Sequence, residues 1–359
     1  MTRVPRYSLT PDYEISRVIR GGWQLAGGHG AIDRKAAVDD LLATAEAGII
    51  TFDCADIYTG VEEIIGDFRK VYGDRRGAEA LDAIHVHTKC VPDLDKLSSL
   101  TRVQLQETID RSRARLGVER LDLVQFHWWD YELGGLAAAS DAVAALSFQQ
   151  ERARLRFPQF APIFDSDHVA HNEGRRVCPL ATIQLQYSLL DRRPEKAHGP
   201  SLAAAHDFHF LCYGTVAGGF PLRSLVGRGG NLWVSWRNRS LTKYKLIIED
   251  FGGLGAVSSP LFADAAQHWP TGMKTDISTI ASAAVLTRPH VAGVIVGARN
   301  RSHLDANLGI GAVTLSSEDL SRIESILDQS TPLEGDVYTL ERDRFGRHGS
   351  IMKYNLNKE

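Results

Sequence analysis

The chain has 359 residues, of which 43% are hydrophobic and 24% are charged, and its formal net charge is −3. That composition supplies a large apolar core, and the slightly negative charge argues against binding to nucleic acid through its phosphates. The four cysteines are scattered without a C-x-x-C pair, and no apolar stretch reaches about 18 residues, so we expect no disulfide framework, no zinc knuckle and no membrane span. The N-terminus lacks the apolar core of a secretory signal, and we expect a cytoplasmic protein.

Short apolar runs alternate with segments of helical spacing along most of the chain. In chain order, strands are expected at residues 14–23, 49–55, 83–89, 121–129, 180–190, 208–214 and 291–298. Helices are expected at residues 34–48, 60–72, 103–117, 135–155, 194–207, 276–288 and 315–327. Repeated strand–helix alternation predicts a parallel sheet covered by helices.

One further unit is poorly formed. Residues 156–179 occupy the place of a fifth strand, but prolines and the absence of a clean alternation weaken the pattern. Eight units predict an α/β fold of the closed (β/α)8 TIM-barrel type. We expect a single domain over residues 1–359, with the barrel at about 15–330 and a polar tail at 331–359. Residues 220–275 are expected to form a long loop after the seventh strand.

Chemically capable side chains lie where three predicted strands end. Asp53, Lys89 and His127 each lie near the end of a separate strand, and Tyr58 follows Asp53 by five positions. In such a barrel the active site lies at the carboxyl ends of the strands. A tyrosine has an ordinary pKa of about 10, and a neighbouring lysine ammonium favours its phenolate. We expect Asp53 to hold Lys89 and Lys89 to tune Tyr58, while Asp56 is interpreted as a turn residue.

Six motifs in order resemble those of the aldo-keto reductases: TFDCADIYTG, HTK, QFHWW, QLQYSLLDRRP, YGTVAGGF and GVIVGARNRSHLDANL. The resemblance covers about residues 15–330. It implies a catalytic tetrad of Asp53, Tyr58, Lys89 and His127. It also implies hydride transfer between a nicotinamide and a small-molecule carbonyl substrate, with Tyr58 as general acid or base and His127 as a hydrogen-bond donor to the carbonyl oxygen.

The resemblance also implies an NADP(H) site without a Rossmann motif. An arginine fork fits a 2′-phosphate, and N–H groups at a helix start attract phosphate. The implied cofactor-binding residues are Gln184, Tyr213, Gly214, Gly218, Gly219, Gly297, Arg299, Asn300, His303 and Asn307. Three tryptophans, Trp23, Trp128 and Trp129, are candidates for the substrate pocket: at least one of Trp128 and Trp129 is expected to line it, and plain packing is the alternative.

Two other patterns suggest different proteins. His85 and His87 form an H-x-H that resembles metal-dependent amidohydrolases, but no further ligands are found on later strands, so we expect a filled barrel interior and no metal. Residues 227–245 are basic and aromatic, as in a nucleic-acid patch, but the net charge argues against that function. The resemblance instead implies a loop that folds over cofactor and substrate.

The chain departs from the family pattern at the fifth strand. Pro162 and Ile163 precede Phe164 where polar side chains normally hold the nicotinamide carboxamide, and Ile183 stands where asparagine is common. These changes predict weak NADPH binding, tighter than NADH, and slow turnover. They also keep open an alternative: an aldo-keto-reductase-fold protein without effective catalysis, acting as a structural subunit with protein partners. The potassium-channel β subunits and a ciliary radial-spoke component represent that class.

Overall fold

The computed structural model describes most of the barrel and its rim. The described residues are 4–28, 30–130, 133, 135–145, 155–160, 181–196, 199–219, 239–251, 276–328, 331–333, 335 and 338–357. Pro162, Ile163 and Phe164, on which the expectation of an altered cofactor wall depends, lie outside them.

Eight parallel strands form the barrel. They are β3 (Val18–Gly21), β4 (Thr51–Asp53), β5 (His85–Cys90), β6 (Leu121–Phe126), β7 (Leu155–Phe160), β8 (Thr182–Gln186), β9 (His209–Tyr213) and β10 (Val291–Gly297). Their order in the sheet is β7-β6-β5-β4-β3-β10-β9-β8. Strand β3, the first barrel strand in the chain, pairs with β10, the last, and this pairing joins the N-terminal and C-terminal halves of the sheet. The end strands β7 and β8 contact each other, which brings the barrel almost to closure. The predicted (β/α)8 fold is confirmed.

The fifth strand begins one residue before the segment expected to hold it. Strand β7 pairs with β6 from Leu121–Leu155 to Phe126–Phe160, and Pro158 lies opposite Val124 within it. Proline has no N–H to donate, and it is tolerated in an edge strand, because one side of such a strand makes no hydrogen bonds to a neighbouring strand. Because β7 ends the ladder, its proline and its irregular pattern are compatible with a strand.

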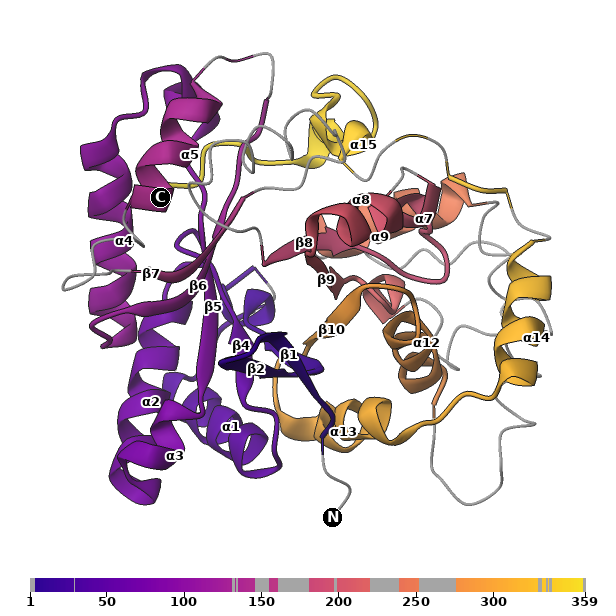
Figure 1. The fold of residues 1–359 in the computed structure, drawn as a ribbon, viewed down its shortest axis with the longest axis horizontal. Helices are drawn as coiled ribbons and strands as arrows, with labels where there is room; N and C mark the ends of the chain where they lie inside the picture. The colour runs from indigo at the N-terminus through magenta and orange to yellow at the C-terminus, as the bar shows by residue number, and fades with distance from the viewer. Residues whose placement is uncertain are drawn as a thin grey trace.

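Helices cover the outside of the sheet (Figure 1). They are α1 (Arg34–Glu46), α2 (Val61–Arg76), α3 (Ala78–Asp82), α4 (Arg102–Leu116), α5 (Leu136–Ala145), α7 (Arg193–Lys196), α8 (Gly199–His206), α9 (Arg239–Asp250), α12 (Ile277–Leu286), α13 (Leu304–Ala312), α14 (Ser317–Leu327) and α15 (Thr339–Arg342). Local signals set their ends: Thr101 and Gln104 form a capping box before α4, and Gly117 follows that helix in the left-handed conformation. Phe52 of β4 packs on Phe68 of α2 with ring centroids 4.9 Å apart, which is typical of the core between sheet and helices.

A hairpin precedes the barrel. Strands β1 (Arg6–Thr10) and β2 (Tyr13–Ser16) pair antiparallel, so the single strand expected at 14–23 is wrong and is two strands that belong to different sheets. Leu9, Tyr13 and Ile15 of the hairpin pack with side chains inside the barrel. The hairpin therefore fills the amino-terminal mouth of the barrel. The carboxyl ends of the strands, which carry the candidate catalytic side chains, lie at the opposite mouth.

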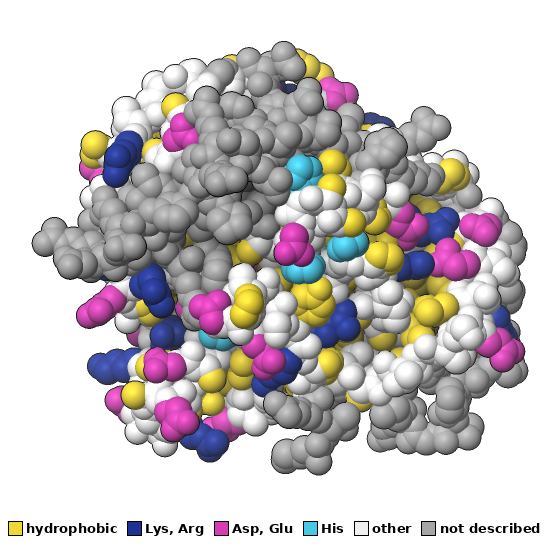
Figure 2. Space-filling model, viewed as in Figure 1, with side chains coloured by type: hydrophobic (Ala, Val, Ile, Leu, Met, Phe, Trp, Pro, Cys, Tyr) yellow, Lys and Arg dark blue, Asp and Glu magenta, His cyan; other side chains and the backbone are white. Residues whose placement is uncertain are grey.

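Two segments outside the expected elements also have structure. Helix α9 lies within the long loop after β9, and a C-terminal segment, residues 338–357, runs across the top of the view from α15 toward α5 (Figure 1). Lys and Arg are interspersed with Asp and Glu over the described part of the visible face (Figure 2). Over the described ranges, no helix is both long and apolar enough to cross a membrane.

Candidate active site

Lys89 and Asp53 form a buried ion pair at the ends of adjacent strands. The Lys89 ammonium donates to Asp53 Oδ2 at 2.8 Å and to the Cys54 carbonyl at 2.7 Å. The two charged side chains are 12% and 5% exposed, so solvent screens the pair weakly. Burial alone lowers the pKa of Lys89, but the charge of Asp53 and that of Tyr58 outweigh it, and the pKa is raised. Lys89 is therefore a fixed cation at this rim.

Tyr58 lies directly beside that cation. The Lys89 Nζ atom is 4.8 Å from the centroid of the Tyr58 ring, and the ring of Trp23 packs edge-on at 4.9 Å. Burial raises the pKa of Tyr58, and the Lys89 charge acts against that rise. The phenol therefore holds its proton at neutral pH, next to a cation that stabilises the phenolate once the proton has left. Such a group can act as a general acid.

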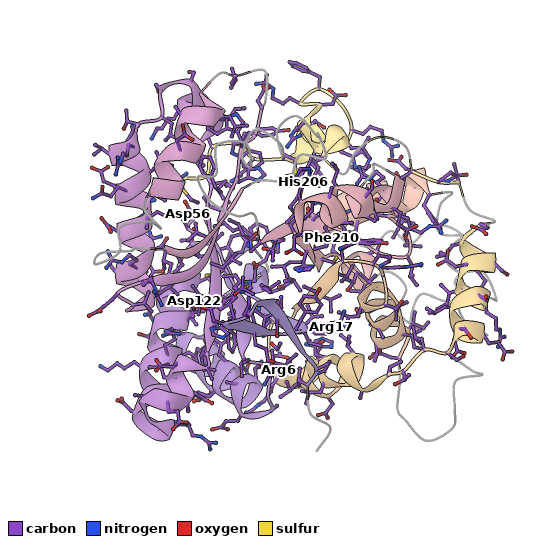
Figure 3. The ribbon with its side chains drawn as sticks, in the orientation of Figure 1. Arg6, Arg17, Asp56, Asp122, His206 and Phe210 are labelled. Atoms are coloured by element: carbon purple, nitrogen blue, oxygen red, sulfur yellow. The ribbon has the colours of Figure 1, made fainter. Side chains whose placement is uncertain are left out.

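Asp56 anchors the turn that carries Tyr58. Its carboxyl group is buried and accepts from the Val91 amide, with both oxygens 3.2 Å from the nitrogen (Figure 3). Burial raises its pKa to about 8. Within the described residues its carboxyl group makes no hydrogen bond to the side chains of Tyr58 or Lys89, so the placement agrees with the interpretation of Asp56 as a turn residue.

His127 completes the group from the end of β6. Its amide donates to the Cys90 carbonyl at 2.9 Å, and the ring of Trp129 lies edge-on with centroids 4.3 Å apart. Burial, Arg342 and Lys89 lower the pKa of His127 to about 3, so the imidazole is neutral at physiological pH. Its Nε2 atom is buried without a hydrogen-bond partner among the described residues. An unpaired buried polar atom is costly, so this nitrogen is a candidate group for binding a ligand.

Two glutamines also bind Asp53, and their role there was not anticipated. The amide of Gln184 on β8 donates to Asp53 Oδ1 at 2.7 Å, and that of Gln125 on β6 donates to the same oxygen at 3.3 Å. Asp53 therefore has partners on both oxygens, and its orientation is set by three other strands. Gln184, one of the implied cofactor-binding residues, lies at the site and is bonded to Asp53. The alternation of β6 predicts that Gln125 points inward with Leu123 and His127.

The three tryptophans separate into two groups. Trp23 contacts Tyr58, and Trp129 contacts His127 while its indole N–H donates to the Pro92 carbonyl at 2.8 Å. Trp128, by contrast, is 0% exposed and packs on Phe126 in the main core. Successive side chains of an extended chain point to opposite faces, which directs Trp128 away from the pocket. This placement agrees with packing as the role of Trp128, and Trp129 is then the tryptophan of the pair that lies beside the candidate site.

The expected cofactor residues gather along one side of the rim. Tyr213 ends β9, and the turn that follows contains Gly214, Gly218 and Gly219. Gly297 ends β10, and the residues after it include Arg299, Asn300 and His303. Asn307 lies on α13. The exposed Arg299 donates to the Ala31 carbonyl at 3.3 Å. The Asn300 side chain accepts from the Ser302 amide at 3.0 Å and so caps the short helical turn there.

The H-x-H pair lies at the other end of the barrel. Tyr13 from the hairpin binds His87 Nε2 through its hydroxyl at 3.1 Å, and its ring packs on His85 with centroids 4.6 Å apart. Burial lowers the pKa of His87 to about 3. No group of three or more metal-ligating side chains is found within the part of the chain that the structure describes. The placement agrees with the interpretation of a filled barrel interior.

Comparisons with known proteins show what the chain is similar to. The family model described as the aldo/keto reductase family matches residues 17–328. The chain is similar to the aldo-keto reductase YhdN of Bacillus subtilis (strain 168), with 24% identity over 327 residues that cover 88% of this chain and 91% of that protein. It is also similar to the NADH-specific methylglyoxal reductase of Escherichia coli (strain K12), with 26% identity over 202 residues, 52% of this chain and 59% of that protein.

Solved structures share the fold. A glycerol dehydrogenase, AKR11B4 from Gluconobacter oxydans, superposes with a TM-score of 0.67 at 23% identity, covering 93% of this chain and 97% of that one. An aldo/keto reductase from Klebsiella pneumoniae in complex with NADP and acetate has a TM-score of 0.63 at 19% identity, covering 90% of this chain and 94% of that one.

Proposed function

Because this chain belongs to the aldo/keto reductase family, we propose that it reduces an aldehyde or ketone with NADPH, or runs the reverse oxidation, with Tyr58 as general acid or base. When bound, the nicotinamide supplies the hydride that reaches the carbonyl carbon. The protein's task is then to orient the carbonyl, to provide the proton for its oxygen, and to exclude water. The observation that carries the proposal is the position of Lys89, held by Asp53 at 2.8 Å and facing the Tyr58 ring at 4.8 Å.

The electrostatics of the site support a proton donor. As negative charge develops on the carbonyl oxygen, the Tyr58 hydroxyl transfers its proton to that oxygen, and Lys89 stabilises the phenolate left behind. His127 is neutral, and in the tautomer with its proton on Nε2 the buried, unpaired nitrogen donates to the same oxygen. In the oxidation direction the same groups take the alcohol proton in reverse.

The chain has groups that fit a dinucleotide. Gly214 and Gly218 have positive φ values of 73° and 68°, a conformation that glycine adopts without strain, so the turn after β9 favours glycine at both positions. Arg299 is exposed at the end of β10 and presents the fork that a 2′-phosphate prefers. We propose NADP(H) over NAD(H) on that basis, although one relative is named as NADH-specific.

The alternative of a non-catalytic subunit stays a prediction. It rests on Pro162 and Ile163, which lie outside the described residues, and so does the expectation of weak binding and slow turnover. In the described part of the site, the ion pair, the phenol and the imidazole support catalysis instead.

The test is carbonyl-dependent oxidation of the cofactor by purified protein. NADPH absorbance is followed at a saturating concentration with methylglyoxal and with other small aldehydes and ketones, and glycerol with NADP⁺ tests the reverse direction. We expect NADPH consumption that requires the carbonyl compound and a lower KM for NADPH than for NADH. Tight NADPH binding without turnover of any carbonyl would support the structural subunit instead.

A further inference from the structure

Glu62 is a buried carboxylate on α2, close in the chain to Tyr58. It lies in the first turn of the helix, and only 1% of its surface is exposed. The hydroxyl of Thr88 on β5 donates to Glu62 Oε1 at 2.6 Å, and the guanidinium of Arg115 near the end of α4 donates to Glu62 Oε2 at 3.2 Å. Each oxygen of this buried carboxylate therefore has a partner, and the two partners belong to two other elements.

The bond to Thr88 holds the strand from which Lys89 projects. Thr88 directly precedes Lys89 on β5 and is buried. Successive side chains of a strand point to opposite faces, so Lys89 points into the barrel mouth and Thr88 points outward to α2. The hydrogen bond from Thr88 therefore anchors the backbone beside Lys89 to Glu62, from the side of the sheet opposite to the candidate site.

The bond to Arg115 holds the turn that carries Tyr58. The same Arg115 Nη1 atom that binds Glu62 also donates to the carbonyl of Asp56 at 3.2 Å. Helices α2 and α4 approach closely at this place, because a Cβ atom on Gly66 would lie 2.2 Å from the carbonyl oxygen of Arg115. Glu62 is thus connected through one partner to the strand of the lysine and through the other to the turn of the tyrosine.

We propose that Glu62 is a positioning residue for the proposed reaction. Through its two partners, it sets how the Lys89 ammonium lies against the Tyr58 ring, whose centroid is 4.8 Å away. The inference rests on the proposed function and adds a residue from the outer side of the sheet. Burying a carboxylate is costly, and a buried ion pair is weak evidence for stability. Catalytic groups, however, must be held within about 0.5 Å of their productive geometry, and these two bonds supply such support.

The pKa of Tyr58 distinguishes positioning from a direct effect of the Glu62 charge. Burial raises the pKa of Tyr58, and the Lys89 charge lowers it. If the loss of Glu62 lets Lys89 move away from the phenol, the pKa of Tyr58 rises further. Removal of a negative charge that acted directly on the phenol would instead lower that pKa. The two explanations therefore predict shifts in opposite directions.

The test is the steady-state kinetics of Glu62→Gln, which keeps the shape of the side chain and removes its charge. With the carbonyl compound that the unmodified chain reduces fastest, we expect kcat to fall about 10- to 100-fold, the effect of misplacing a catalytic group by about 1 Å. The dissociation constant for NADPH should stay within about twofold. The basic limb of the pH profile of kcat, where Tyr58 loses its proton, should move to higher pH.

Variants of Thr88 repeat the test without a change of charge. Thr88→Val removes the hydroxyl and keeps the shape, so we expect kcat to fall and the basic limb to move in the same direction as in Glu62→Gln. Thr88→Ser keeps the hydroxyl and should retain most of the turnover. If Glu62→Gln does not fold, this pair decides the proposal, and equal kcat values for Thr88→Val and Thr88→Ser would overturn it.

Glu63→Gln is the matched control. Glu63 is the next residue on α2 and also forms an ion pair with Arg115, 3.1 Å long, but its side chain is 35% exposed. We expect Glu63→Gln to leave kcat and its pH profile unchanged. A loss of kcat as large as that of Glu62→Gln would show that the charge on α2, and not the bonds of Glu62, sets the rate.

Hydrogen exchange of the cofactor-free protein gives a readout that does not depend on turnover. Exchange in Glu62→Gln is expected to be faster in residues 54–60 and 88–91 and unchanged elsewhere. An unchanged kcat in folded Glu62→Gln, a basic limb that moves to lower pH, or faster exchange throughout the chain would each overturn the inference. An unmodified chain that reduces no carbonyl compound would overturn the proposed function instead, and hydrogen exchange would then decide whether Glu62 holds the two segments.

Discussion

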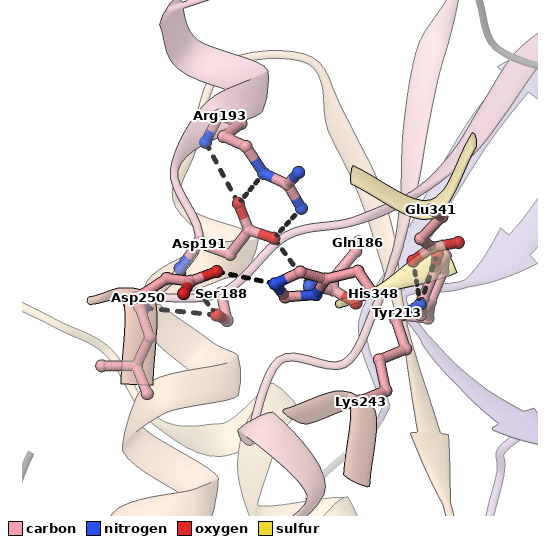
Figure 4. A network of polar contacts seen from close by, with 10 residues as sticks. Gln186, Ser188, Asp191, Arg193, Tyr213, Lys243, Asp250, Glu341 and His348 are labelled. Carbon is pink, nitrogen blue, oxygen red and sulfur yellow. Dashed lines mark hydrogen bonds and ion pairs between the residues drawn. The ribbon is translucent and has the colours of Figure 1, made fainter. Parts of the chain in front are cut away.

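On one side of the rim, Asp53, Lys89 and His127 stand at the ends of three neighbouring strands, whereas on the other side Tyr213 and its glycine turn are covered by α9 and the C-terminal segment. The first side is built from strand ends that the barrel itself brings together. The second depends on partners far apart in the chain, such as Lys243 and Glu341 (Figure 4). The first side holds the residues proposed for the chemistry, and the second holds residues proposed to bind the cofactor.

The largest expected effect is on the catalytic side. Lys89→Met keeps the length of the side chain but removes the ammonium that stabilises the Tyr58 phenolate. We expect turnover to fall by about 10²–10⁴-fold, the range for losing effective general acid catalysis. The variant also leaves the Asp53 carboxylate without its counter-charge, although Gln125 and Gln184 still donate to it, so Lys89→Met with Asp53→Asn is the control for a stranded charge. Turnover close to that of the unmodified chain in either variant would contradict the assignment.

The two adjacent tryptophans give the next largest effect. Trp128→Ala opens a cavity in the core and is expected to lower the free energy of unfolding by about 3–5 kcal/mol. Trp129→Ala is expected to raise the KM for the carbonyl substrate and to cost less stability, because Trp129 is only partly buried beside His127. Denaturant unfolding and steady-state kinetics measure both. The reverse pattern would show that the side chains had been assigned to the wrong faces.

A smaller effect concerns the turn that carries Tyr58. The pKa of Asp56 is raised to about 8 in the folded chain, above its ordinary value near 4, so the fold favours the protonated carboxyl. Stability from this group is complete below pH 4 and is lost as the pH rises toward 8. Asp56→Asn, which imitates the neutral acid, should therefore gain about 1–3 kcal/mol relative to the unmodified chain between pH 5 and 7.

The control for that prediction is Asp122→Asn. Asp122, labelled in Figure 3, also accepts a hydrogen bond from a strand amide, that of Val86 at 2.8 Å. Its variant therefore measures how much stability changes when a carboxylate that accepts from a backbone amide is replaced by asparagine. Urea unfolding at several pH values measures both variants. A difference between Asp56→Asn and the unmodified chain that stays constant with pH would contradict the raised pKa.

The same comparison explains what the sequence could predict. Asp53, Lys89 and His127 were located because parallel strands converge at one mouth of the barrel, so local patterns determine which residues meet. The motif alone does not decide between Trp128 and Trp129, whereas the alternation of side chains along the strand end separates them. The long pairing of Lys243 with Glu341 has no local signal. Helix α9 does have a local signal in the sequence, because the apolar residues Leu241, Tyr244 and Ile248 recur at helical spacing.

The central claim is that Tyr58 gives the proton to the carbonyl oxygen, and Tyr58→Phe tests it most directly. Carbonyl reduction and the NADPH dissociation constant are measured on the same preparations, with Tyr7→Phe, a tyrosine bonded to His209 away from the tetrad, as the control. We expect turnover of Tyr58→Phe to fall by about 10²–10⁴-fold while NADPH binding stays within about twofold. Unchanged turnover in Tyr58→Phe would contradict it, because the proton would then come from another group.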